Sequence, residues 1–225
     1  MPQIGTYQHS CGIKKIGDYV FDGCRELRGI SIPEGVKILG DSAFGFCDKL
    51  ASVILPESLE LIEEDAFSNC RRLSSILIPA NVQEIGNKAF VFCDKLNIIT
   101  VDADNEVYDS RSNCNAIIET KSNTLLAGCL STIIPNSIKA IGYGAFWECN
   151  QLVTIEIPEG VERIEDLAFA WCKKLESISL PGTITFIGEN VFEDCMALSH
   201  IYIPTGTKSQ FEELLDNYRD ILIER

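Results

Sequence analysis

An interval of 23 residues runs through most of this chain of 225 residues. Each repeated cysteine follows a phenylalanine by three residues, and the shared pattern reads L-x-x-I-x-I-P-x-x-V-x-x-I-G-x-x-A-F-x-x-C. Such self-similarity is typical of stacked repeats, because one copy cannot bury its own apolar positions. The repeated prolines are Pro33, Pro56 and Pro79, followed by Pro135, Pro158, Pro181 and Pro204.

One copy predicts a short strand followed by a return path. Val53 and Leu55 alternate as in a strand with one buried face, and Pro56 ends that strand because it has no N–H group to donate. Phe67 and Cys70 are expected on one side of a single helical turn. These features predict a curved repeat solenoid over residues 1–204, with one parallel β-sheet on its concave side and short helical or 3-10 turns on the other.

A glycine recurs near the start of each predicted return turn. Two copies carry Glu63 or Glu165 there instead, so the requirement is not strict. Glycine is favoured where the backbone needs a positive φ, and we expect that reason here. The glycines are Gly17, Gly40, Gly86, Gly142 and Gly188.

One repeat, residues 102–134, is ten residues longer than the others. Its segments "AIIET" and "TLLAG", separated by "KSN", predict a β-hairpin insert. Pairing Thr120 with Asn123 would place Cys114 opposite Cys129, where a disulfide and two neighbouring reduced thiols are both compatible with the spacing. The insert could serve as an interaction element or be only a variant coil.

Ten cysteines in a chain of this size could form a disulfide framework. Seven of them instead share one inward position beside a phenylalanine, where free cysteine packs as a small hydrophobic residue. Four of these cysteines precede the longer repeat and three follow it, and these numbers do not divide evenly into disulfide pairs. We therefore expect a buried ladder of reduced cysteines. Cys11 lies outside that ladder and has no assigned role. The ladder positions are Cys24, Cys47, Cys70, Cys93, Cys149, Cys172 and Cys195.

The charge balance excludes several classes of partner. Asp and Glu number 33 against 19 Lys and Arg, a formal net charge of −14. Nucleic acids and anionic membranes require clustered basic residues, so neither is an expected partner. No apolar run approaches the roughly 18 residues of a membrane span. The start, "MPQIGTYQHS", has neither the basic region nor the following apolar region of a signal peptide.

The sequence carries no catalytic or cofactor motif, so we expect neither enzyme activity, a cofactor nor a metal site. Zinc ligands would need closely spaced cysteine pairs or added histidines, and His9 and His200 are the only histidines. The stretch "DADNE" starts like a calcium loop, but Val107 stands at the required glycine and Asn113 at the closing glutamate.

Residues 205–225 break the repeat and predict a C-terminal cap. Phe211, Leu214, Leu215 and Tyr218 have helical spacing, which indicates an amphipathic helix. Repeat stacks need such a cap over the last coil. The following "ILIE" could add a closing strand.

The repeated pattern resembles leucine-rich repeats of the BspA-like, or Treponema-type, class over residues 10–204. "LASVIL" and "LVTIEI" match the strand half of the general leucine-rich form, whereas the cysteine follows A-F-x-x. The insert words "YDSRSNCNAIIET" also resemble a feature of this class. The resemblance implies a non-enzymatic recognition or adhesion module of a bacterial cell-surface or secreted protein. Its partner would be a host-matrix or bacterial surface protein, with glycan binding or a structural spacer role as alternatives.

In such a solenoid the outward residues of the concave sheet form the expected binding surface. Small hydroxyl side chains dominate one column of outward positions. The other column carries Ile54 and Leu77, and Ile98 and Ile133 lie nearby in the first column and the next coil. Neighbouring exposed apolar residues either mark an interaction patch or simply suit a parallel strand. The candidate partner-binding residues are Ser52, Ile54, Ser75, Leu77, Ile98, Thr100, Ile133, Thr154, Glu156, His200 and Tyr202.

Overall fold

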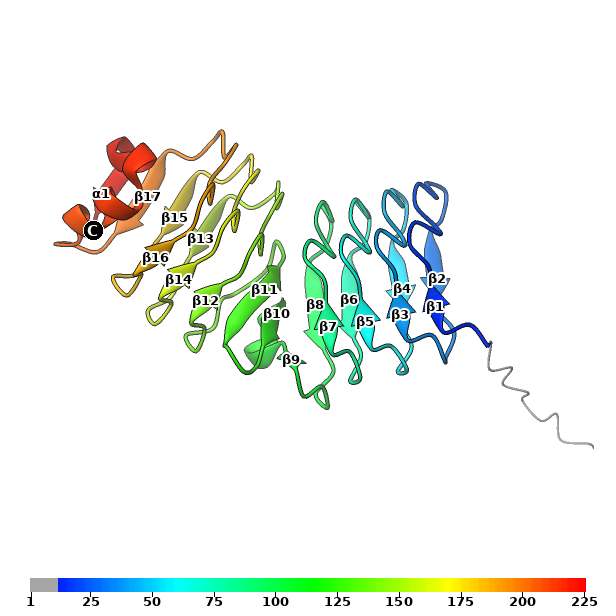
Figure 1. Ribbon diagram of the computed structural model, residues 1–225. Helices are drawn as coiled ribbons and strands as arrows, with labels where there is room; N and C mark the ends of the chain where they lie inside the picture. The colour runs from blue at the N-terminus through cyan, green and yellow to red at the C-terminus, as the bar shows by residue number, and fades with distance from the viewer. Residues whose placement is uncertain (1–11) are drawn as a thin grey trace, which may run out of the picture.

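The computed structural model describes residues 12–225, so Cys11 and His9 lie outside the described residues. The chain forms a row of stacked coils that ends in a small helical cap, in agreement with the predicted solenoid (Figure 1). One face carries the longer strands, which run parallel to one another. They are β2 (Gly29–Ser31), β4 (Ser52–Ile54), β6 (Ser75–Ile78), β8 (Ile98–Val101), β13 (Thr154–Glu156), β15 (Ser177–Ser179) and β17 (His200–Ile203).

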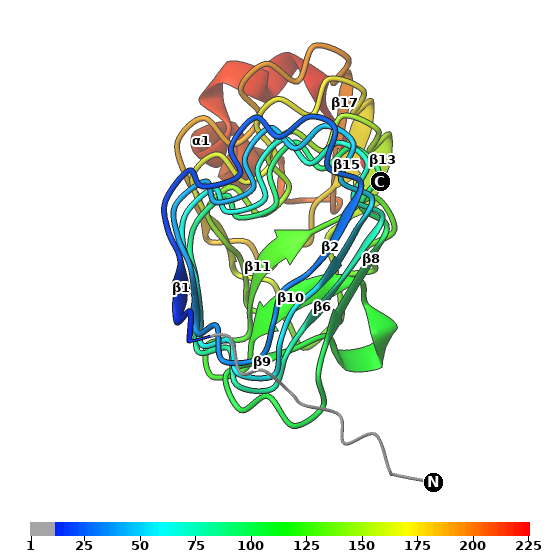
Figure 2. The same cartoon turned by 90° about the vertical axis from the view of Figure 1, so that its right-hand side faces the viewer.

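A second ladder of short strands lies on the opposite side of the coils, as the view along the stack shows (Figure 2). The prediction of a single sheet is therefore incomplete, because each return path also pairs with its neighbours. These strands are β1 (Lys15–Ile16), β3 (Ile38–Leu39), β5 (Leu61–Ile62), β7 (Glu84–Ile85), β12 (Ala140–Ile141), β14 (Arg163–Ile164) and β16 (Phe186–Ile187).

The segment between each short strand and the next long strand, here called the arc, differs from the helical turn that the sequence predicts. Its residues form consecutive turns, and the backbone adopts positive φ at two points of each regular arc, in most cases at residues other than glycine. In one coil these are Asp65 at 54° and Asn69 at 59°. Alternating backbone handedness lets the arc N–H groups point along the stack and pair with the next coil, as Phe67 N–H does with Ala89 O at 2.9 Å.

Four of the five repeated glycines, all but Gly17, serve close packing between coils, and none of the five has a positive φ, contrary to the expectation from sequence. A Cβ atom added at Gly40 would lie 2.3 Å from Asp18 Oδ1, and one at Gly86 would lie 2.4 Å from Glu64 N. Neither glycine has a positive φ. Glycine is therefore selected here because the backbone of the previous coil approaches too closely for a side chain.

The core is a stack of identical positions from successive coils. Phe44 and Phe67 stack at 5.3 Å between ring centroids, and Phe146 and Phe169 at 5.1 Å, with all four rings fully buried. Offset stacking of this kind adds to the burial of each ring. The buried residues form two clusters that meet at the insert.

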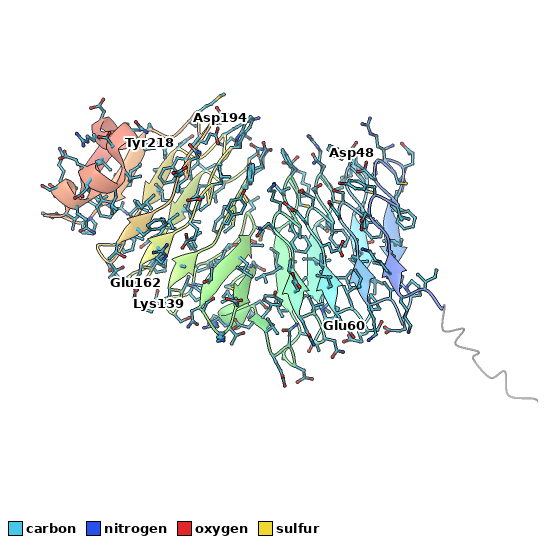
Figure 3. The ribbon with its side chains drawn as sticks, in the orientation of Figure 1. Asp48, Glu60, Lys139, Glu162, Asp194 and Tyr218 are labelled. Atoms are coloured by element: carbon cyan, nitrogen blue, oxygen red, sulfur yellow. The ribbon has the colours of Figure 1, made fainter. Side chains whose placement is uncertain are left out.

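Ion pairs join neighbouring coils at the solvent edge. Lys37 pairs with Glu60 at 2.5 Å, and Lys139 pairs with Glu162 at 2.8 Å, in both cases 23 residues apart. Figure 3 shows Lys139 beside Glu162. Both pairs are exposed, so each contributes little to stability and serves mainly to keep register.

The insert contains β9 (Tyr108–Asp109), the 3-10 turn η1 (Arg111–Asn113), β10 (Ala116–Glu119) and β11 (Thr124–Gly128). Strands β10 and β11 pair antiparallel, starting from Glu119 opposite Thr124. An irregularity between Ile117 and Ile118 then shifts the register by one residue. Strand β11 also pairs parallel with β12, which places the hairpin in the short-strand ladder.

That register shift separates the two cysteines of the insert. Cys129 Sγ donates to the carbonyl oxygen of Asn115 at 3.3 Å, so Cys129 no longer faces Cys114. Both thiols are free and buried. A one-residue bulge is enough to do this, because it changes which residues stand opposite each other beyond it.

The cap follows the last long strand and covers the end of the core. It consists of α1 (Lys208–Leu214), η2 (Asp216–Ile221) and β18 (Leu222–Glu224). Phe211 is fully buried, and Tyr218 packs edge-on against Phe192 at 5.5 Å between centroids. Strand β18 pairs parallel with β17 and extends the long-strand sheet. Within residues 12–225, no helix is long and apolar enough to cross a membrane.

Candidate interaction surface

The outward side chains of the long strands form the surface here called the long-strand face. Its first half exposes large apolar side chains: Ile54 is 64% exposed, Leu77 is 50% exposed and Ile98 is 49% exposed. The alternating residues Ile76 and Ile99 are buried at 2% and 0%. The period of two in these strands therefore puts one apolar set in the core and another in solvent.

The strand register brings the apolar residues together. Leu77 stands opposite Thr100, and Ser75 stands opposite Ile98, so Leu77 and Ile98 are diagonal neighbours on adjacent strands. Ile54 occupies the same position as Leu77 one coil earlier. Ser52 and Ser75 are exposed beside them, whereas Thr100 is half-buried and its hydroxyl donates to Ile76 O at 3.4 Å.

Ile133 lies beyond a break in this face. It is 76% exposed, but it belongs to no strand, and its backbone N–H donates to Cys114 O at 3.0 Å within the insert coil. The hairpin therefore interrupts the long-strand ladder between β8 and β13. Ile133 continues the exposed apolar surface without sharing the strand geometry of Ile98.

The second half of the face is more polar. Thr154, Glu156 and His200 are exposed, and Tyr202 is half-buried. The rings of His200 and Tyr202 stack at 5.9 Å, and the Arg225 guanidinium lies 4.3 Å from the Tyr202 centroid.

Strand β18 places Ile223 beside Tyr202, which confirms the closing strand expected from "ILIE". The cap therefore supplies one more strand, and Arg225 from its end lies over the tyrosine ring.

Five of the seven repeated cysteines, all but Cys24 and Cys149, donate a hydrogen bond to a backbone carbonyl group. Cys24 is exposed, so the expectation that all seven are buried is wrong at the first coil, which has no described coil before it. Cys47 Sγ lies 3.2 Å from Phe21 O, and Cys172 Sγ lies 3.1 Å from Phe146 O, each 26 residues earlier in the chain. Burial raises the pKa of the Cys47 thiol to about 11. A thiol held in this protonated state is a poor nucleophile and a poor metal ligand.

No group of three or more His, Cys, Asp or Glu residues within residues 12–225 is arranged to hold a metal ion. The ring Nδ1 of His200 lies 2.9 Å from Ser199 Oγ, on the solvent-exposed face.

A coiled stack with this repeat matches one known family. The family model described as the BspA type leucine-rich repeat region matches residues 7–118 and 123–221, in six copies. The chain belongs to the BspA-type leucine-rich repeat family. This membership confirms the resemblance drawn from the repeated pattern. No curated protein matches the chain significantly.

Solved structures of bacterial repeat proteins share the fold. A leucine-rich cell surface protein from Faecalibacterium prausnitzii is 30% identical, with a TM-score of 0.55, over 88% of this chain and 65% of that one. The pneumococcal vaccine antigen PcpA is 26% identical, with a TM-score of 0.71, over 84% of this chain and 54% of that one. A leucine-rich repeat protein from Eubacterium ventriosum is 22% identical, with a TM-score of 0.67, over 87% of this chain and 59% of that one. At this level of identity the likeness shows a shared fold only. The chain thus spans between about half and two thirds of these proteins.

Proposed function

We propose that this BspA-type repeat protein is a non-enzymatic protein-recognition module of a bacterial cell-surface or secreted protein. The observation that carries the proposal is the exposed apolar cluster of Ile54, Leu77 and Ile98 on an otherwise well-packed stack. Adjacent apolar side chains on a rigid surface favour burial against a partner. Two of the similar proteins are named as a cell surface protein and a vaccine antigen, which supports the proposed location.

The partner would be a host-matrix or bacterial surface protein that covers the first half of the long-strand face. Ser52 and Ser75 would supply hydrogen bonds around the apolar centre, as polar residues do at the rim of many interfaces. Thr154, Glu156 and His200 would extend the contact toward the cap. Residues 1–204 would act as the recognition solenoid, and residues 205–225 as its cap.

Glycan binding is less well supported by the side chains of this face. Sugar rings stack on open aromatic surfaces, and Tyr202 is the one aromatic ring among the candidate residues besides the His200 imidazole. Its ring faces His200 on one side and carries Arg225 at 4.3 Å, so little of it is open. A passive spacer role would need no exposed apolar cluster.

The test compares two double variants with the wild type as bait for host-matrix, serum and bacterial-surface proteins. Ile54→Glu with Leu77→Glu puts two charges into the centre of the proposed interface. Val20→Glu with Met196→Glu adds the same charges at residues that are 55% and 79% exposed and lie off the long strands. A partner held by the wild type and the control pair, but lost by the first pair, supports the proposal. Equal retention by both pairs would place binding elsewhere.

A further inference from the structure

The insert coil lacks most of the arc that the regular coils contribute. Fourteen residues separate Leu61 from Ser75, the first residues of a short strand and of the next long strand. Only seven separate Thr124, the first residue of β11, from Ser131, which the 23-residue interval aligns with Thr154. The missing residues correspond to the A-F-x-x-C part of the pattern. Most of one arc is therefore absent from the stack between the arcs at residues 86–93 and 142–149.

On one side of this gap, backbone N–H groups lose their acceptors. In the preceding coil, Phe67 N–H and Asn69 N–H donate to the next arc, each at 2.9 Å. Their equivalents 23 residues later are Phe90 and Phe92, together with Lys88. Within residues 12–225, the N–H groups of Lys88, Phe90 and Phe92 donate to no backbone acceptor. They stand at alternating positions and are directed along the stack, as their counterparts are.

On the other side, carbonyl groups lose their donors. Ala145 O accepts from Gly128 N–H at 2.8 Å, and this is the one backbone hydrogen bond that the shortened coil donates to the next arc. The flanking carbonyls of Tyr143 and Trp147 occupy positions that receive an N–H group in the regular arcs. Within the described part of the chain, neither receives a backbone hydrogen bond. Unpaired backbone groups away from water are costly, so both walls favour a hydrogen-bonding ligand.

A cavity of about 220 Å³ lies between the two walls, and we call it the seam cleft. Lys88 and Phe90 line it from one arc, and Tyr143 and Trp147 from the other. A smaller cavity of about 30 Å³ adjoins it and reaches Phe92. Gly128 lines its inner end and packs directly on the Phe146 ring, since a Cβ atom there would lie 2.2 Å from that ring.

Trp147 flanks both cavities and stands where the other arcs carry smaller residues such as Ser68 and Ala170. The ammonium of Lys88 lies 5.1 Å from its ring and reaches across the gap from the opposite arc. Tyr143 packs edge-on against the same ring at 6.3 Å. Because these three side chains are exposed or only partly buried, the cleft is bordered by groups that can move aside.

We propose that the seam cleft binds an extended peptide segment of a partner protein. This segment inserts between the two arcs and takes the place of the missing part of the arc. Its carbonyl oxygens would accept from Lys88, Phe90 and Phe92, and it would run along that arc because Gly128 already occupies Ala145 O, between the carbonyls of Tyr143 and Trp147. A peptide backbone is the ligand whose donors and acceptors alternate at this spacing, and strand addition to an open edge is an established mode of recognition.

This site is separate from the long-strand face, because it lies among the arcs and includes none of the residues proposed there. Loss of partner binding through Ile54 and Leu77 would therefore leave the seam cleft intact. Conversely, a filled seam cleft would leave the long-strand face unchanged. The two proposals can fail independently of each other.

The test uses a synthetic peptide with the sequence of residues 41–48 carrying Cys47→Ser, since this segment contains the A-F-x-x-C part of one arc. The protein carries Trp171→Phe, which leaves Trp147 as its one tryptophan. We expect a saturable change in Trp147 emission below about 1 mM peptide. We also expect hydrogen exchange at the amides of Lys88, Phe90 and Phe92 to slow by about tenfold or more on binding.

A matched pair of substitutions locates the binding. Ala127→Phe fills the cleft from the hairpin and should abolish the titration, whereas Ala51→Phe adds the same group at an exposed position outside it and should not. The amide measurement needs neither of these substitutions, so it remains decisive if Ala127→Phe folds poorly. The proposal is overturned if emission shows no saturation, if the three amides exchange at unchanged rates, or if folded Ala127→Phe protein binds like the wild type.

Discussion

Cys70 Sγ donates a hydrogen bond to the carbonyl oxygen of Phe44, 3.2 Å away and 26 residues earlier in the chain. The same relationship recurs from Cys93 to Phe67 at 3.3 Å and from Cys195 to Phe169 at 3.1 Å. A thiol is small and apolar enough to be buried, and it can still donate one weak hydrogen bond. This pairing gives a physical reason for a cysteine at the same position of successive coils.

The first prediction concerns the reactivity of these thiols, which we propose remain reduced. In a Cys11→Ser background, iodoacetamide should modify the exposed Cys24 of the native protein much faster than the buried Cys47 and Cys70. The thiolate is the reactive species, and burial raises the pKa of both buried thiols. Peptide mass spectrometry before and after denaturation gives the rates. Modification of native Cys70 at the rate of Cys24 would contradict the buried arrangement.

The same labelling, without reductant, tests the insert. Cys114 and Cys129 should both become available after denaturation, because the hairpin register directs Cys129 to Asn115. A peptide pair that stays linked until reduction would show that the two thiols are bridged.

The second prediction concerns the aromatic stack. Phe67→Ala should lower the free energy of unfolding by about 3–5 kcal/mol, because the ring is fully buried between Phe44 and Phe90. Phe46→Ala is the matched control in a neighbouring arc, where the ring is 49% exposed, and should change stability by at most about 0.5 kcal/mol. Urea denaturation measures both. Equal losses for the two variants would mean that the stack carries no special share of stability.

The third prediction is a pH dependence at Glu148. Burial raises the pKa of this carboxyl above its ordinary value near 4.5, although Asn150 donates to it at 3.0 Å. The folded state therefore binds a proton more tightly than the unfolded state does. Its contribution is fully present below the ordinary value and is lost as the pH rises through the raised value.

Glu148→Gln removes that ionisation and retains an acceptor for Asn150. We expect the variant to melt at a higher temperature than the wild type at pH 7, with the difference disappearing below about pH 4. Thermal denaturation at several pH values measures the effect. A constant difference across this range, or a lower melting temperature at pH 7, would mean that the buried charge is not the cause.

The periodicity of the sequence was sufficient to predict stacked coils, because only stacking buries the recurring Val, Leu, Phe and Cys positions. It did not predict the arc geometry. The spacing of Phe67 and Cys70 also fits one helical turn, and the positive φ of Asp65 and Asn69 has no unique sequence signature, since aspartate and asparagine tolerate that region among several others.

The insert shows a second limit. The hairpin strands were visible as alternating apolar segments, but a bulge between Ile117 and Ile118 changes the partner of Cys129 without a glycine or proline to mark it. The seam cleft had a signal that the sequence analysis did not use. The seven-residue distance from Thr124 to Ser131 leaves too little chain for a complete arc once β11 is aligned with the short strands.

The central claim is that a protein partner contacts the apolar cluster of the long-strand face. Its most direct measurement is site-specific photo-crosslinking, with a benzophenone amino acid in place of Ile54 in one sample and in place of Met196 in another. Both positions are well exposed, at 64% and 79%, so access of the probe is matched. The account predicts that a captured partner crosslinks at position 54 and not at 196. A partner that crosslinks only at position 196, or binds without crosslinking at either position, would contradict it.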